Sequence, residues 1–479
     1  MPLIRFLTMV LAPLLLTSLA VAAPVRQPAV AGSFYPADAK TLQAAVAGFL
    51  AAAKPAPAEG ELRALVVPHA GYVYSGPTAA HSYQRLRGSG IKRVILVGPA
   101  HRVPVSGAVI DPKGRWRTPL GEVPIDERLA QKLLESGPGI SAASEPFAAE
   151  HSLEVQLPFL QRVLGDFTFV PVLIGTPSAA TIQGLAAQIA LLLRSDPGAL
   201  LVCSTDLSHY HNAATAHGKD TRVVDAVKRM AVGELETLLR SGGGEACGGW
   251  PLLLTMLAAR GAGATNGALF HYADSSAASG DTAKVVGYAA MGLYRTPLTK
   301  ARGQELLRLA RQTVTAKVKG EPLPEPACDD PRLAADGAAF VTLNDRNGQL
   351  RGCIGAILPV EPLCRSVRNN AVAAASRDSR FRPVRPEELP GLSIEVTVLS
   401  PLEPVNDPRE ITIGTHGVYL QARGTSSVFL PQVAPEQGWD LTTTLRQLAY
   451  KAGLPPEGWR DGQLYRFTAE IVHEEKGRH

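Results

Sequence analysis

Cysteine is scarce in this sequence, with five residues in a chain of 479. The count is odd, the spacing is wide and no C-x-x-C pair occurs. This pattern excludes a dense disulfide scaffold and leaves at least one thiol unpaired in a monomer, where it is a candidate for metal binding or reactivity. Two structural alternatives are open: Cys203 has the setting of a buried strand residue, and Cys353 is a candidate for pairing with Cys364.

Excess charge of one sign is also missing. The formal net charge is only +5, and there is no lysine-rich run, which argues against a nucleic-acid partner. Basic residues do gather at Arg377, Arg380, Arg382 and Arg385, a cluster that favours a solvated face. With no internal repeat, a chain of this length predicts two or three domains.

The one long hydrophobic run stands at the start of the sequence. Residues 1–5 form a short basic start with Arg5, residues 6–19 are nearly all apolar, and Ala20-Val21-Ala22 is a small-x-small site. This order predicts a signal peptide over residues 1–22, cleaved after Ala22. An uncleaved anchor is the alternative, although a membrane span needs about 20 apolar residues. We therefore expect a periplasmic or secreted protein with no membrane segment after cleavage.

Short apolar runs alternate with helical patterns over residues 23–296. Continuous apolar runs suit strands buried on both faces of a mainly parallel sheet, and alternation with helices predicts an α/β domain. In one helical pattern, residues 153–164, Pro158 is expected to kink the helix. The expected strands are residues 62–67, 93–97, 167–174, 199–203 and 284–288.

Polar side chains follow three of these runs. His69 follows the first, His101 the second, and Asp206 and His209 follow the run 199–203. Sites in open α/β sheets form beyond the carboxyl ends of strands, so we expect these residues at one rim. A lone histidine is more often structural, but three strand ends that agree favour a site, with Asp206 orienting a histidine.

Cys247 belongs to the same prediction. It lies in a glycine-rich segment directly before an apolar helix, where free backbone amides are expected to lower the pKa of the thiol. Two imidazoles, from His69 and His101, with one thiolate leave coordination positions open, as in catalytic metal sites. The alternative is a half-buried structural cysteine.

Three further residues are weaker candidates for substrate binding or for support of the ligands. His151 and Glu154 stand at the start of a predicted helix, where they either line the pocket or cap the helix. Tyr72, in the loop after His69, either faces the site or packs.

These residues lie in motifs that resemble the Memo family. The motifs are PAVAGSFYP from Pro28, PHAGYVYSG from Pro68, GPAH from Gly98, EHSLEVQLPFLQ from Glu150, STDLSHY from Ser204, ACGGWP from Ala246 and VVGYAAM from Val285. The resemblance, over about residues 25–295, implies a fold similar to the class III extradiol (LigB-like) non-haem iron dioxygenases. It also implies His69, His101 and Cys247 as metal ligands and His209 as an acid/base residue. The dioxygenases have a carboxylate in place of this cysteine, and a thiolate favours copper or zinc as well as iron.

A second domain, α+β in class, is predicted for residues 304–479 after a polar linker at 297–303. Residues 306–318 have the spacing of an amphipathic helix, and residues 340–354 read as a hairpin around Asn347-Gly348. Residues 361–378 look helical and 392–399 like a strand. Asp440 is a good N-cap for a helix that stops at Gly453.

This half resembles the AMMECR family. The matching motifs are LRGCIG from Leu350, HGVYL from His416, LPQVAPEQGWD from Leu430 and KAGLPPEGW from Lys451. The resemblance implies a two-lobed α+β fold but no defined reaction. In the first motif Arg351 and Cys353 share a strand face, and Gly352 and Gly355 would let a ligand approach the backbone. A structural hairpin with a packed cysteine is the alternative.

Together the two resemblances indicate a fusion of two parts of the AmmeMemoRadiSam system. The third part, a radical S-adenosylmethionine protein, would be a separate chain and a candidate partner. Two functions stay open. One is a dioxygenase-like redox metalloenzyme that holds iron or copper, with zinc as a third metal, and acts on an unknown small molecule while His209 transfers protons. The other is a non-enzymatic metal-binding or peptide-binding adaptor.

Overall fold

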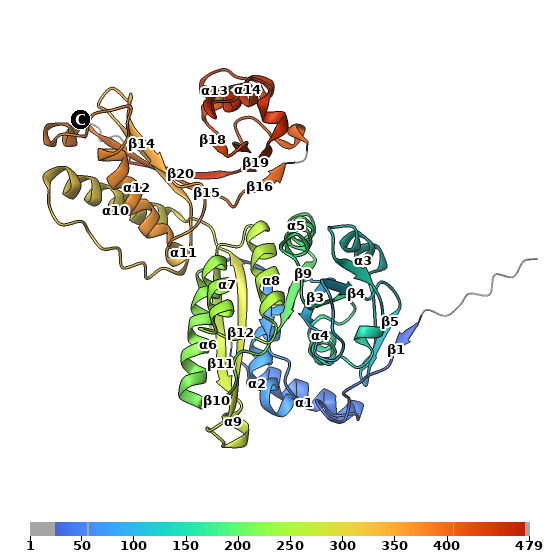
Figure 1. The fold of residues 1–479 in the computed structure, drawn as a ribbon. Helices are drawn as coiled ribbons and strands as arrows, with labels where there is room; N and C mark the ends of the chain where they lie inside the picture. Colours follow the sequence, from blue (N-terminus) through green and yellow to red (C-terminus); the bar gives the residue numbers. More distant parts are fainter. Residues whose placement is uncertain (1–23, 55–56, 406, 475–479) are drawn as a thin grey trace, which may run out of the picture.

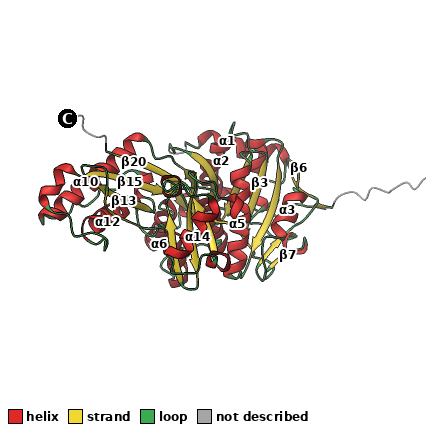
Figure 2. Cartoon of the chain, turned by 90° about the horizontal axis from the view of Figure 1, so that it is seen from above, coloured by secondary structure: helices red, strands yellow, loops and turns green. Residues whose placement is uncertain are grey.

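The computed structural model describes residues 24–54, 57–405 and 407–474. The predicted signal peptide lies outside them. Two domains follow one another along the chain, an α/β domain and a sheet-rich second domain (Figure 1), and in the view from above part of the second domain overlaps the first (Figure 2). None of the helices in the described ranges is long and apolar enough to cross a membrane.

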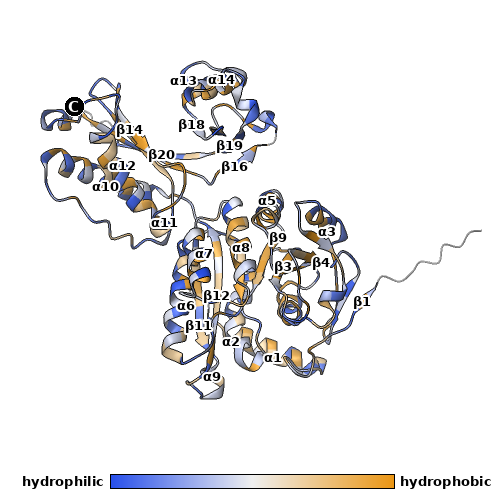
Figure 3. Ribbon diagram, in the orientation of Figure 1, coloured by the Kyte–Doolittle hydropathy of each residue, from blue (hydrophilic) through white to orange (hydrophobic). Residues whose placement is uncertain are grey.

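The first domain is built on a nine-stranded sheet whose four central strands are parallel neighbours. In spatial order they are β2 (Glu61–Val67), β9 (Ala199–Ser204), β3 (Arg93–Pro99) and β8 (Thr168–Ile174). Their residues are almost wholly buried and form the hydrophobic centre of the domain (Figure 3). Four of the five apolar runs predicted as strands are thus confirmed as buried parallel strands.

The outer strands are mixed in direction. The predicted strand 284–288 is the start of β12 (Val285–Arg295), which runs antiparallel to β2, β10 (His209–His211) and β11 (Asn266–Asp274). At the other edge β4 (Ala108–Ile110) is antiparallel to β8 and parallel to β7 (Ile140–Ala142). A separate three-stranded sheet contains β1 (Val25–Arg26), β5 (Arg115–Thr118) and β6 (Gly121–Pro124).

Helices cover both faces of the sheet, as parallel strands require. On one face are α5 (Ala179–Ser195), α6 (Ala213–Lys228), α7 (Val232–Ser241) and α8 (Gly249–Gly261). On the other are α1 (Ala39–Ala52), α2 (Tyr72–Tyr83) and α4 (Leu157–Leu164). Two shorter helices are α3 (Glu127–Leu134) and α9 (Ser276–Ser279).

Pro158 does not kink a helix, contrary to the prediction. Residues Glu154–Gln156 form a 3-10 turn and α4 begins at Leu157, which places Pro158 in the first turn. Proline is tolerated there because a first-turn amide has no partner within the helix.

The second domain contains two four-stranded sheets. The first consists of β14 (Leu350–Gly355), β13 (Ala339–Asn344), β15 (Ser393–Leu399) and β20 (Ala469–His473), packed against α10 (Lys300–Lys319) and α12 (Leu363–Ser376). The second consists of β16 (Glu403–Val405), β19 (Gln463–Phe467), β17 (Gly417–Ala422) and β18 (Thr425–Phe429), packed against α14 (Leu441–Lys451). The predicted hairpin, helices and strand are present, and Asp440 caps α14 by accepting from the Thr443 amide.

Two predictions about this domain need correction. The linker is shorter than 297–303, because α10 begins at Lys300 and is capped by Thr299. Cys364 forms a disulfide with Cys328, not with Cys353, since the spacing of cysteines does not determine their connectivity. Cys203 is free and buried, as its strand predicted.

Candidate metal centre

Three predicted ligands meet at one rim of the central sheet. His69 follows β2, His101 follows β3, and Cys247 stands two residues before α8. One donor atom from each lies within 4.8 Å of the others, a grouping that can hold a metal ion. Nε2 of His69 is 3.2 Å from Sγ of Cys247, and the His69 and His101 ring centres are 5.1 Å apart. Neighbouring parallel strands end at the same edge, which explains why distant residues converge.

The tautomer of His69 follows from its hydrogen bonds. The Ser204 hydroxyl donates to the Ser152 carbonyl at 2.6 Å and accepts from Nε2 of Gln156 at 2.8 Å. Its remaining contact is with Nδ1 of His69 at 3.0 Å, and because the only hydroxyl hydrogen is already used, Nδ1 must be the donor. Nε2 therefore carries a free lone pair directed at Cys247. Burial lowers the pKa of His69 well below its usual value, which keeps the ring neutral, as a ligand requires.

His101 is oriented by a buried carboxylate. Glu150 accepts the His101 amide at 2.6 Å through Oε2, and its Oε1 lies 3.2 Å from Nδ1 of the same residue. The amides of His151 and Ser152 also donate to Oε1, both at 2.9 Å. Burial alone would raise the pKa of Glu150, but these hydrogen bonds hold it well below its usual value. An ionised carboxylate on Nδ1–H leaves Nε2 of His101 as the atom that could bind a metal, an arrangement common at metal sites.

His151 lies beside this group. Its ring stacks on His101 at 4.8 Å between centres and contacts the edge of His69 at 5.5 Å. Burial lowers the pKa of His151 to about 4, and its Nδ1 lies 3.2 Å from Oε1 of Glu150 without forming a hydrogen bond. His101, Glu150 and His151 form a second grouping of donors that shares His101 with the first.

The Cys247 thiol does not behave as its position before a helix predicted. Burial and the nearby Asp206 carboxylate raise its pKa, and this outweighs the lowering effect of the amides of Asp206 and Gly248. The prediction of a lowered pKa is therefore wrong for the metal-free protein. A bound cation would supply the missing stabilisation, since coordination deprotonates a thiol outright.

Asp206 supports the centre through the backbone. Its Oδ1 accepts the His69 amide at 2.7 Å, its own amide donates to Sγ of Cys247 at 3.3 Å, and its carbonyl accepts the Cys247 amide at 3.2 Å. Burial raises the pKa of Asp206 to about 6. We expected this residue to receive the second N–H of a ligand histidine, but Ser204 does so. Asp206 instead fixes the two ligand loops against each other.

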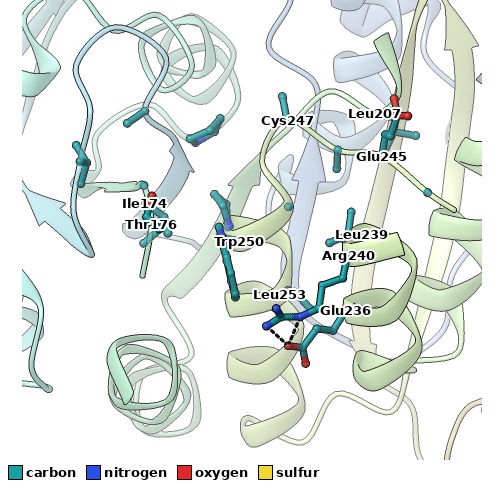
Figure 4. A pocket seen from close by; sticks show the side chains of 18 of the residues that line it. Ile174, Thr176, Leu207, Glu236, Leu239, Arg240, Glu245, Cys247, Trp250 and Leu253 are labelled. Atoms are coloured by element: carbon teal, nitrogen blue, oxygen red, sulfur yellow. Dashed lines mark hydrogen bonds and ion pairs between the residues drawn. The ribbon is translucent and has the colours of Figure 1, made fainter. Parts of the chain in front are cut away.

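A cavity of about 670 Å³ opens beside the centre and is lined by Cys247 and His209. Trp250 and, from α7, Glu236 and Arg240 line the same cavity (Figure 4). Nδ1 of His209 donates to the Leu207 carbonyl at 2.8 Å, so its Nε2 is free. The volume lies within the range of small-molecule sites.

Two weaker candidates are structural. Tyr72 is buried among aromatic rings, and its hydroxyl donates to the Val155 carbonyl at 2.6 Å. Glu154 is fully buried and binds Arg26 at 2.7 Å, the amides of Ala29 and Val30, and the Tyr35 hydroxyl at 2.6 Å. Its carboxylate anchors the first described segment rather than lining a pocket.

The residues of the LRGCIG motif also have protein neighbours. Arg351 donates to Glu388 at 2.7 Å, and the Cys353 thiol accepts from Thr342 at 3.3 Å. A side chain on Gly352 would meet the Ala374 carbonyl at 2.4 Å, and one on Gly355 would meet the Phe340 ring at 2.1 Å. These glycines therefore permit close packing within the domain, whereas the sequence predicted room for a ligand.

Sequence reasoning missed three supporting residues, Glu150, Ser204 and Gln156. Glu150 stands directly before His151 and Ser204 ends an apolar strand, which are the only signals the sequence carries for them. The fold and the site together define a class of protein: an α/β protein with two imidazoles and a thiol at the rim of its sheet.

Comparison with protein families agrees with that class. Residues 26–292 match the model of the Memo-like protein family and residues 307–472 match that of AMMECR1. The chain therefore belongs to the Memo-like family, and it carries an AMMECR1 domain fused behind its Memo domain.

Two of the relatives are named MEMO1 family proteins. A MEMO1 family protein of Thermoplasma volcanium is 35% identical over 268 residues, which is 56% of this chain and 97% of the relative. One of Methanopyrus kandleri is 36% identical over 278 residues, 56% of this chain and 98% of the relative. Among solved structures, an uncharacterized protein of Pyrococcus horikoshii is 39% identical and covers 37% of this chain and 93% of its own, with a TM-score of 0.35.

Proposed function

We propose that the chain is a redox metalloprotein that holds iron or copper on His69, His101 and Cys247 and acts on a small molecule. The observation that carries the proposal is the direction of the lone pairs. Ser204 and Glu150 each occupy Nδ1 of one histidine, which leaves Nε2 of both rings available as donor atoms beside one thiol. Histidine nitrogen and thiolate sulfur suit iron, copper and zinc.

The surrounding residues supply the functions that the metal does not. A bound iron or copper ion would contribute electron transfer and a Lewis-acid centre. The cavity beside Cys247 is the binding place for the substrate. His209, which lines it and is held by the Leu207 carbonyl, exchanges protons with the substrate through Nε2. Asp206 positions His69 and Cys247 and does not touch the substrate.

The alternative is a metal-binding or peptide-binding adaptor without turnover. The cysteine in place of the dioxygenase carboxylate favours it, because the enzymes that the fold resembles use a different third ligand. The free Nε2 of His209 at the cavity wall favours the enzyme, since sequestration of a metal needs no acid/base group.

We also propose that the protein works in an oxidising compartment, the periplasm or outside the cell. The Cys328–Cys364 disulfide supports this, because such bonds persist mainly outside the cytoplasm. A cytoplasmic radical S-adenosylmethionine partner would then be separated from it. Cell fractionation tests whether the protein is exported. Recovery of the full-length chain in the cytoplasm would contradict export, and the radical S-adenosylmethionine protein would again be a candidate partner.

The decisive experiment measures metal in the chain from Ala23 to His479, purified without oxygen, beside Cys247→Ala. We expect near-stoichiometric iron or copper in the first and none in the second. Absence of metal from both proteins would favour the adaptor. His209→Ala should keep its metal and lose turnover, and loss of metal from that variant would show that His209 is a ligand.

A further inference from the structure

A second large cavity, of about 1020 Å³, lies between the two domains. The first domain contributes Glu59, Arg229 and Asn266 to its wall, and the second contributes Arg302 and Arg332. Arg332 belongs to α11 (Pro331–Ala334), a short helix that packs against β11 of the first domain at the domain junction (Figure 1).

Arg332 is buried without a partner. Its residue is only 4% exposed, and its Nε makes no hydrogen bond. Across the described ranges, no carboxylate or carbonyl is bonded to its guanidinium. The nearest acid on its own helix cap, Asp330, is engaged by Arg302 at 2.9 Å and by the amides of Arg332 and Leu333. Glu470, on β20, influences Arg332 electrostatically but lies beyond ion-pair distance.

The other charges of the cavity are largely compensated. Arg302 binds Glu59 at 2.7 Å in addition to Asp330. Arg229 pairs with Glu234, and Lys228 pairs with Asp225 at 3.2 Å. Arg222 donates to the Gly243 carbonyl, and Asp329 is exposed at the rim. Arg332 is thus the buried cation of this wall that lacks a counter-charge.

An unpaired buried charge is costly, and buried charges in proteins are as a rule paired with an opposite charge. We propose that this interdomain cavity binds a small molecule carrying a carboxylate or phosphate group, with Arg332 as its anchor. The planar guanidinium presents paired donors that match either oxyanion, and the volume is that of a metabolite-sized ligand. Because both domains form the wall, the bound anion fastens one domain to the other. Burial lowers the pKa of Arg332, because no bonded anion stabilises the charged guanidinium.

Two variants of the full mature chain test the proposal. Arg332→Met keeps the length of the side chain and removes its charge, and Arg302→Met does the same to a neighbour that already has acidic partners. Thermal unfolding is followed in chloride, then with inorganic phosphate or citrate at equal ionic strength, and binding of each anion is measured by calorimetry.

In chloride, Arg332→Met should unfold at the same temperature as the wild type or higher, because an uncompensated charge has been removed. Arg302→Met should unfold at a lower temperature, because two carboxylates lose their partner. Saturable binding of phosphate or citrate should weaken at least about 30-fold in Arg332→Met. Whichever probe binds more tightly identifies phosphate or carboxylate as the preferred group.

Two results would overturn the proposal. An equal rise of unfolding temperature in the wild type and in Arg332→Met would be a general effect of excluded salts, without a site. A lower unfolding temperature of Arg332→Met in chloride, matched by Glu470→Gln, would show that Glu470 neutralises Arg332 within the protein.

Discussion

Cys247 and Cys353 are both half-buried free thiols next to glycine, one in each domain. Burial raises the pKa of both. Their neighbours differ in kind. Sγ of Cys247 lies 3.2 Å from Nε2 of His69. The Cys353 thiol instead accepts from the Thr342 hydroxyl, and the Cys353 amide donates to Asp378 at 2.8 Å.

The difference shows what turns a cysteine into a candidate ligand. The residue type and the adjacent glycines are the same, so these alone do not mark a site. Donor atoms from other strands mark it, because a metal needs several lone pairs directed at one point. Around Cys353 the described groups satisfy one another, and the pattern is that of a packed hairpin.

The largest expected effect comes from removing each thiol in turn. Cys247→Ser should reduce the affinity for iron, copper or zinc by at least about 100-fold, because one of three ligands is lost. Cys353→Ser should leave metal content unchanged. Metal analysis after equilibration with a chelator gives both values, and loss of metal from the Cys353 variant would end the distinction between the two thiols.

Replacement of the supporting carboxylates sharpens the comparison. Glu150→Gln removes the charge that holds Nδ1–H of His101, and we expect metal affinity to fall by about 10–100-fold. Asp378→Asn, at the carboxylate beside Cys353, should not change it. Chelator competition measures both, and unchanged affinity in Glu150→Gln would mean that His101 is oriented by its backbone alone.

The sequence predicts where the strands end and which side chains follow them. It does not predict the hydrogen bonds and the burial around those side chains, and the reasons are physical. Apolar runs that end in histidine predict strand ends and hence the meeting of His69 and His101. The hydrogen bonds that set their tautomers come from Ser204 and Glu150, which are 135 and 49 positions away, and pairing at that range leaves no local pattern. The pKa of Cys247 was mispredicted because its burial depends on tertiary packing, which outweighs the helix terminus.

The thiol of Cys353 should alkylate slowly at neutral pH. Burial disfavours the thiolate, which raises the pKa of Cys353 above the ordinary value of 9.0, and only the thiolate reacts. The rate with iodoacetamide should keep rising about tenfold per pH unit through pH 9 in the Cys247→Ser background. A plateau near pH 8 would indicate a thiolate stabilised by Arg380, and would make Cys353 a candidate nucleophile.

The smallest expected effect concerns Asp378. The hydrogen bond from Arg380, with help from the Cys353 amide, lowers the pKa of Asp378 from 3.8 to about 2. A lowered folded-state pKa means stability that is present above about pH 4 and is lost as the pH falls through 2. Arg380 is 55% exposed, so solvent reduces the contribution to about 1 kcal/mol. Asp378→Asn should cost that amount at pH 6 and less at pH 3, measured by denaturant unfolding.

The control is Asp407→Asn, which disrupts a similar ion pair with Arg409 at the surface and should change stability little at either pH. Equal losses in both variants would show that the carboxylate beside Cys353 is no better supported than a surface pair.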